Sequence, residues 1–323
     1  MRELTKGRVD SLSNNQLDDE CAESLGALVA AAQPSNGATV DLRNNELSEN
    51  ALRQLARAAV TNRCLLSLRL EGNPEETSSA TLARRQIDAA LHRNERLRRH
   101  RTMLKMLPEI RESSLSVMSC KLEYVELTIA DAQSLSVALR MNRSITELRL
   151  RDNVLPPEGA RRILAALERH ISLTSLALMD NNPGDIGLLA ASRLVRQSAT
   201  LQTLHIVNSR QIEASPISRL TAAHWHHTMA RDSTATRQLA LVHCGLTDLD
   251  IGVIASGIAS SCQAQYLSFR GNGITDRSVH VLVRVIGRCQ HLRHLDIVRG
   301  DSVFLFGCGS LVMCHRRATT SSH

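Results

Sequence analysis

The chain has 323 residues, of which 43% are hydrophobic and only 2% aromatic, so a sizeable core must be built from Leu, Ala, Val and Ile. No apolar run approaches the roughly 20 residues that span a bilayer, and the eight cysteines lack CxxC spacing, which favours reduced thiols in an intracellular protein. The net charge of +7 is concentrated in residues 84–121, so the high pI describes one segment rather than the whole surface.

The first expected elements are short strands, each followed by a helix. In "VDLRNNEL" and "LLSLRLEGNP" the asparagines at 45 and 73 follow the strand leucines at the same spacing. Between them, "ENALRQLARAAV" has an apolar stripe at helical spacing. The stripe consists of Leu52, Leu55, Ala56, Ala59 and Val60.

A long basic segment then interrupts the pattern. A rough helical stripe runs through Leu82, Ile87, Ala90, Leu91 and Leu97, and Pro108 is expected to end or kink that helix. We expect residues 1–102 to form a first array closed by this basic helix, and residues 103–120 to form a linker. Residues 84–105 could bind an acidic protein partner, although a solvated capping helix is the simpler interpretation.

The strand pattern returns in residues 121–300, the expected second array. The interval that separates Asn45 from Asn73 occurs again in two series of positions. The first series is Asn153, Asn181 and Ser209, and the second is Cys244, Asn272 and Gly300. Equal intervals of about 28 residues predict a repeat protein whose unit is a strand plus a helix. The Asn side chain is expected to bond backbone groups of the turn that a buried loop would leave unpaired. We expect the last segment, 301–323, to be an irregular tail.

The repeats resemble the ribonuclease-inhibitor-like class of leucine-rich-repeat proteins over roughly residues 9–300. The resemblance implies an α/β solenoid, or horseshoe, with parallel strands on the concave face and helices on the convex face. It also implies protein binding as the commonest use, with no bound cofactor.

The sequence contains no convincing motif for catalysis or metal binding. The three lysines, Lys6, Lys105 and Lys121, do not follow a glycine, so the sequence has no P-loop. The stretch "HWHH" suggests a zinc site formed by His224, His226 and His227. However, no Cys or carboxylate lies at short spacing to complete the three or four ligands that zinc sites usually have. A solvated loop with Trp225 packed over the convex helices is the preferred interpretation. The sequence thus predicts neither an enzyme nor a metal protein, and neither nucleic acid nor a small-molecule substrate is expected.

The concave face is the candidate binding site, because side chains that alternate with the core leucines point into it. Its centre is expected to be an apolar floor that includes Ala177 and Ala240, with Arg and His at both ends, which is the anatomy of a protein interface. The candidate partner-binding residues are Glu147, Arg149, Arg151, Met179, His205, Val207, Val242, Tyr266, Arg270, His294 and Asp296.

The leading functional hypothesis is a non-enzymatic scaffold or adaptor that binds a protein partner on this face. We expect a cytoplasmic protein with a cytoskeletal, centrosomal or ciliary association. Two alternatives stay open: a GTPase-regulating module similar to relatives that activate Ran, and the target-recognition part of a ubiquitin ligase or receptor. Because no capping segment is visible at either end, we expect the chain to be part of a larger protein or the tail to be an unusual cap.

Overall fold

The computed structural model divides into two compact units, Met1–Thr102 (unit 1) and Met103–His323 (unit 2), which we describe separately. The described residues are 10–32, 38–74, 77–113, 118–208, 216–230, 235–257, 263–275, 277–278, 281–282, 291–299, 302–307 and 310–315. Ser209 and Gly300, assigned above to the Asn position of their repeats, lie outside these ranges.

Unit 1 alternates strands and helices. Its parallel three-stranded sheet contains β1 (Asp10–Ser11), β2 (Ala38–Asp41) and β3 (Leu65–Arg69). Its helices are η1 (Asp19–Cys21), α1 (Ala22–Ala31), α2 (Glu49–Thr61) and the first part of α3 (Ser78–Arg111).

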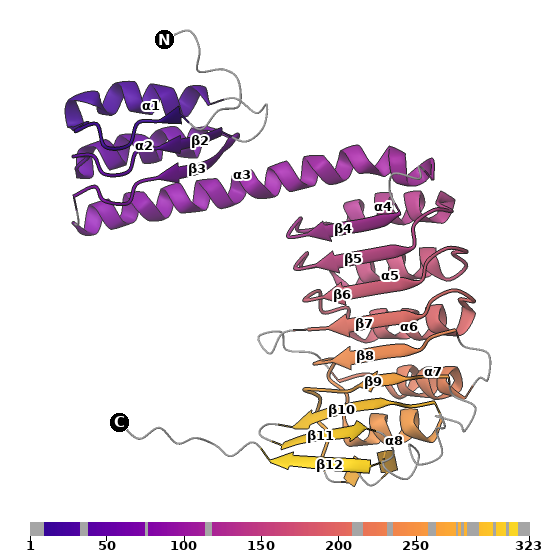
Figure 1. Ribbon diagram of the computed structural model, residues 1–323. Coiled ribbons are helices and arrows are strands. Elements are labelled where there is room, and N and C mark those ends of the chain that lie inside the picture. Colours follow the sequence, from indigo (N-terminus) through magenta and orange to yellow (C-terminus); the bar gives the residue numbers. More distant parts are fainter. Residues whose placement is uncertain are drawn as a thin grey trace. The chain divides into compact units, whose positions relative to one another are not determined.

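Unit 2 repeats the same alternation on a larger scale (Figure 1). Seven parallel strands pair in chain order: β4 (Ser119–Glu123), β5 (Glu147–Arg151), β6 (Ser175–Met179), β7 (Thr203–Val207), β8 (Gln238–Val242), β9 (Tyr266–Ser268) and β10 (His294–Arg299). Behind them, each helix packs on the next: α4 (Ile129–Met141), α5 (Pro157–Leu167), α6 (Gly184–Gln197), α7 (Arg219–Met229) and α8 (Asp248–Ser256). The fold is an α/β leucine-rich-repeat solenoid.

The strand leucines form the core, as their alternation predicts. Leu148, Leu176 and Leu204 pair in register across β5, β6 and β7, and all three are fully buried. Leu178, two residues further along β6, is also fully buried. Every repeat therefore contributes the same layer of side chains between the sheet and the helices.

The asparagine position ties each turn to the preceding repeat, which confirms its predicted role. Asn153 Nδ2 donates to the Leu122 carbonyl at 2.8 Å, and its Oδ1 accepts from the Val125 amide at 2.8 Å. Asn181 does the same for the Leu150 carbonyl and the Asn153 amide, at 3.0 and 3.2 Å. Buried turn backbone, which would be costly if left unpaired, is thereby satisfied.

A second line of polar side chains lies where each helix returns to a strand. Asn142, His170 and Ser198 follow one another at the repeat interval, and each accepts a hydrogen bond from the amide of the third residue after it. The acceptors are Asn142 Oδ1 (2.8 Å), His170 Nδ1 (3.1 Å) and Ser198 Oγ (3.1 Å). The sequence does not reveal this line, because three different residue types occupy the same position in successive repeats.

Helix α3 corrects the expected linker at 103–120. The helix continues through Pro108 to Arg111, because Met103 and Ile110, which are both fully buried, hold it on either side of the proline. The loss of one helical amide is thus offset by packing. Two residues assigned to apolar stripes, Val60 and Leu82, are instead exposed.

The histidine-rich insertion is a helix rather than the expected solvated loop. Ser218 caps α7 by accepting from the Thr221 amide. Thr221, Ala222, Trp225 and Met229 lie at helical spacing and are buried, Trp225 completely. On a helix, His224 and His226 do not share a face, and the described residues contain no group of three or more possible metal ligands.

The expected irregular tail is also corrected. Strands β11 (Ser302–Gly307) and β12 (Ser310–His315) extend the sheet beyond β10 as antiparallel neighbours. Their aromatic and aliphatic residues favour extended backbone, and β11 pairs with an edge of β10 that would otherwise be open. Among the described helices, none is long and apolar enough to cross a membrane.

We predict that Leu178→Asp unfolds unit 2, because it places a carboxylate in the fully buried layer of the core. Thermal unfolding followed by circular dichroism checks this. Met179→Asp is the matched control, since Met179 is half-buried beside Arg151. A native-like melt of the Leu178→Asp variant would contradict the packing described here.

Asn153→Ala is expected to reduce the free energy of unfolding by roughly 2–4 kcal/mol, because the Leu122 carbonyl and the Val125 amide lose a buried partner. Chemical denaturation measures this loss. Ser134→Ala, on the exposed side of α4, should change stability little. Equal stability of the two variants would rule out the proposed role of the asparagine.

His170 should make stability depend on pH. Burial, and then the charge of Arg143, lower the pKa of His170, so below about pH 6.5 the unfolded chain binds more protons than the folded one. Stability is therefore full above that pH and falls as the pH decreases. His170→Asn should make the decrease shallower, because an asparagine already serves the same position at Asn142. Replacing the exposed His92 by Asn is the control, and identical slopes for His170→Asn and wild type would refute this assignment.

Candidate functional site

The side of β5–β10 that faces away from the helices is called here the open sheet face (Figure 1). Residues that alternate with the buried leucines line it in rows set by the strand register. Its middle row is Arg149, Ala177, His205, Ala240, Ser268 and Asp296. The next row along the strands is Arg151, Met179, Val207 and Val242.

A shallow hollow of about 370 Å³ occupies the β7–β9 part of this face. It forms because Ala240 and Ser268 are small and buried, while larger neighbours stand on both sides. The lining residues are His205, Val207, Asn208, Ala240, Val242, His243, Tyr266, Ser268, Arg270 and Asp296.

Six of the eleven candidate residues therefore meet at the hollow: His205, Val207, Val242, Tyr266, Arg270 and Asp296. The other five lie outside its lining, on β5, β6 and β10 of the same face: Glu147, Arg149, Arg151, Met179 and His294. Arg270 does not lie on a strand, because β9 ends at Ser268 and Arg270 is in the following turn.

Two lining residues, Asn208 and His243, were not among the candidates predicted from the sequence. Asn208 Oδ1 accepts from the Asn182 amide at 3.1 Å, and its Nδ2 donates to the His243 carbonyl at 3.1 Å. Asn208 thus performs part of the task assigned to Ser209, one position earlier than the regular interval indicates. His243 adopts a left-handed backbone conformation, with φ at 51°, which a repeat interval cannot reveal.

Charged side chains gather at the β5 end of the face. Glu147 accepts from Ser119 Oγ at 2.7 Å and from Arg149 Nη2 at 3.3 Å. These hydrogen bonds, Ser119 first, together with the charges of Lys121 and Arg149, lower the pKa of Glu147 despite its partial desolvation. Arg151 bonds Asp152 and lies 5.8 Å from the centre of the Tyr124 ring.

Aromatic rings gather at the other end. Tyr266 stacks on His294 with centroids 4.9 Å apart and planes 1° from parallel. The centroid of His205 lies 6.4 Å from that of Tyr266. Burial, and then the charge of Arg149, lower the pKa of His205, which favours a neutral imidazole near neutral pH.

Three nucleophilic side chains of unit 2, one of them in the hollow, have surroundings that do not activate them. Ser268 Oγ donates directly to Asp296 Oδ2 at 3.2 Å, so the serine bonds a carboxylate rather than the imidazole that usually activates such a nucleophile. Burial raises the pKa of the Cys120 thiol to about 11 and that of Cys244 further. Both thiols are therefore protonated and unreactive at neutral pH.

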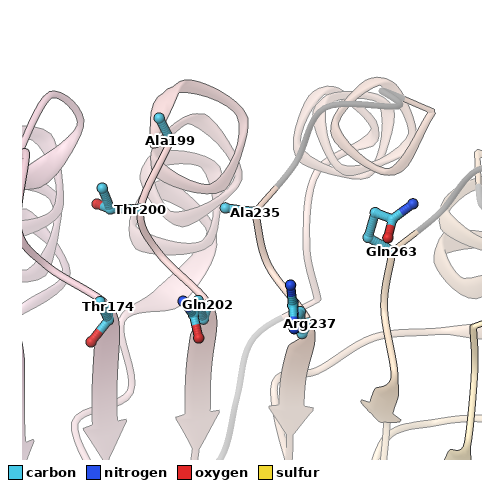
Figure 2. A pocket seen from close by; sticks show the side chains of 7 residues that line it. All are labelled: Thr174, Ala199, Thr200, Gln202, Ala235, Arg237 and Gln263. Atoms are coloured by element: carbon cyan, nitrogen blue, oxygen red, sulfur yellow. The ribbon is translucent and has the colours of Figure 1, made fainter.

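A second hollow, of about 390 Å³, lies at the amino-terminal ends of β6–β9 (Figure 2). Two of its polar side chains already bond the backbone of the preceding repeat. Thr174 Oγ1 donates to the Thr146 carbonyl at 3.0 Å, and Thr200 Oγ1 donates to the Leu173 carbonyl at 2.8 Å. These hydroxyls stabilise the stack, so this hollow is the weaker candidate for ligand recognition.

Several arginines in the basic segment of α3 already form ion pairs or hydrogen bonds within the chain. Glu95 bonds Arg98 and Arg99 at 2.7 Å each. Arg93 donates to the carbonyls of Val60 and Asn62 at the end of α2, at 3.0 and 2.7 Å, where a cation favours the helix C-terminus. This reduces the positive charge available to an acidic partner.

Comparisons with known proteins agree with the repeat architecture. A family model described as "Leucine Rich repeat" matches residues 142–164. The protein NLRC5 of Mus musculus is 24% identical over 226 residues, which is 64% of this chain and 12% of that protein. The ribonuclease inhibitor of Sus scrofa is 24% identical over 201 residues, covering 55% of this chain and 44% of the inhibitor.

The chain thus spans less than half the length of either relative. A solved structure of the yeast Rad7 and Elc1 complex aligns with 89% of this chain and 69% of its own matched chain, at 15% identity and a TM-score of 0.34. The repeat interval, the strand register, the asparagine position and the two named relatives agree on one assignment. The chain has a leucine-rich-repeat fold and is similar to proteins of the ribonuclease-inhibitor-like class.

Proposed function

We propose that the chain is a binding scaffold that holds a protein partner on the open sheet face of unit 2. The observation that carries the proposal is the composition of that face. An apolar centre of Met179, Val207 and Val242 is flanked by Arg149 and Arg151 on one side and by Tyr266, Arg270 and His294 on the other. Protein interfaces combine an apolar centre with a polar rim, and Arg and Tyr are enriched among residues that dominate binding energy.

The shape of the site supports a macromolecule over a small ligand. The hollow is shallow, and the middle and adjacent rows extend beyond it across all the strands from β5 to β8. A small molecule is typically enclosed on most sides by its pocket, whereas an array of in-register strands offers a broad surface. By its name, the pig relative inhibits a ribonuclease, which is itself a protein.

The proposal includes a non-enzymatic role, since Ser268 bonds Asp296 and the buried thiols of Cys120 and Cys244 are protonated. An acidic protein partner at residues 84–105 of α3 is a separate and weaker proposal, because Arg93, Arg98 and Arg99 already have partners within the chain.

We also propose a cytoplasmic location with cytoskeletal, centrosomal or ciliary association, which rests on the repeat architecture alone. Imaging of the tagged protein together with markers of these structures tests it. A tagged protein that is spread uniformly through the cell, without enrichment at any of these markers, would count against this location. A rate change in a GTP turnover assay would instead favour the GTPase-regulating alternative.

The binding proposal predicts that Arg149→Glu combined with Arg270→Glu weakens partner capture roughly tenfold or more, because it reverses charge at both ends of the apolar centre. Affinity purification with quantitative mass spectrometry measures this for each partner that the wild-type chain recovers. Thermal melts should remain native-like, since Arg149 is half-exposed and Arg270 exposed.

The matched control reverses two charges on the helix side, Arg161→Glu on α5 and Arg193→Glu on α6. This control should recover the same partners as wild type. Undiminished capture by the Arg149/Arg270 variant, or an equal loss in the control, would overturn the proposal for this face.

A further inference from the structure

Two basic residues flank the small residue Ala177 in the middle row, and the position above Ala177 is called here the gap. Arg149, Ala177 and His205 occupy the same register position on three successive strands. Strands lie about 4.8 Å apart, so the backbones of Arg149 and His205 are roughly 10 Å apart. The methyl group of Ala177 fills little of the space between them, and the charge of Arg149 acts on His205.

Both side chains contain a polar atom that the protein leaves unsatisfied. Among the residues that the structure describes, neither Arg149 Nε nor His205 Nε2, which are both buried, has a hydrogen-bond partner. Buried polar atoms are normally paired, and an unpaired one costs stability. Arg149 Nη2 donates to Glu147 Oε1 at 3.3 Å, and Ser119 Oγ donates to Oε2 of the same carboxylate at 2.7 Å.

The two strands beside His205, β6 and β8, carry no charged side chain. Beside His205, β6 and β8 present Ser175, Ala177, Met179, Gln238, Ala240 and Val242. Among the described residues, the other titratable or charged groups of this face and its turns include Lys121 and Glu123 on β4, Glu147 and Arg151 on β5, Tyr266 on β9, His243 and Arg270 in the turns, and His294 and Asp296 on β10. Asp296 lies three strands from His205 and accepts from Ser268.

We propose that the open sheet face receives an acidic side chain of its protein partner between Arg149 and His205, above Ala177. The inference rests on the proposed function and adds the chemistry of the anchoring residue. A carboxylate has acceptors for a guanidinium and an imidazole at once. The adjacent apolar floor of Met179, Val207 and Val242 then receives a neighbouring apolar side chain of the partner.

The proposal also implies that binding takes up a proton. Without a partner, burial and the charge of Arg149 lower the pKa of His205. A bound carboxylate opposes both effects and favours the imidazolium. Because a partner carboxyl group stays ionised above about pH 5.5, affinity should increase as the pH falls from about 8 to about 6.

The test is a selection from a phage-displayed library of random peptides on the full chain, with counter-selection on Ala177→Trp, which fills the gap. We expect the recovered peptides to share an Asp or Glu. Replacing that residue by Asn or Gln in synthetic peptides should weaken binding about tenfold or more, as for loss of a charge-assisted hydrogen-bond pair.

Arg149→Gln and His205→Gln should each weaken binding of the same peptides by a similar factor. His205→Gln should also abolish the severalfold gain in affinity at lower pH. Arg161→Gln, on the helix side of unit 2, is the matched control and should bind like wild type. Circular dichroism confirms that each variant is folded.

The outcomes separate the two proposals. The inference is overturned if the recovered peptides require the open gap but share no acidic residue. It is also overturned if they bind Arg149→Gln and His205→Gln as tightly as wild type. In either case the proposed function stands. A selection that enriches no peptide on wild type over Ala177→Trp counts against both.

Discussion

The structure depends on pairing the backbone groups of buried turns. Each coil of the solenoid bends twice in the interior, where water cannot satisfy an amide or carbonyl group. At one bend Asn153 and Asn181 bond the preceding repeat, and at the other Asn142, His170 and Ser198 accept from the chain as it enters the next strand. Both lines recur at the same interval from β4 to β7, so hydrogen bonding ties successive repeats together at equivalent positions.

The regular pairing of successive repeats has consequences for the surface. Because successive strands pair residue for residue, side chains one repeat apart become neighbours from β4 to β7. Positions between the core leucines are free to vary without loss of packing, and here they vary from Arg149 to Ala177 to His205. The same register that buries Leu148, Leu176 and Leu204 thus creates the unequal row that we interpret as a binding surface.

Much of this architecture could be predicted from the sequence, because equal intervals and alternating leucines report a period directly. The elements that differed are those where packing overrides a local signal. Pro108 does not end α3, since Met103 and Ile110 are buried around it, and the histidine-rich insertion folds as α7 because Trp225 is buried. The hollow was only partly foreseen: Asn208 and His243 line it from turns, where backbone conformation rather than alternation decides which way a side chain points.

The central claim is that the open sheet face, and not the helix layer, is the working surface of unit 2. Hydrogen–deuterium exchange of the chain, alone and with a partner that it recovers, tests this most directly. The account predicts added protection in peptides covering β5–β10 and the turns at Asn208 and His243, with α4–α8 unchanged. Protection confined to the helices, with the strands unaffected, would contradict it.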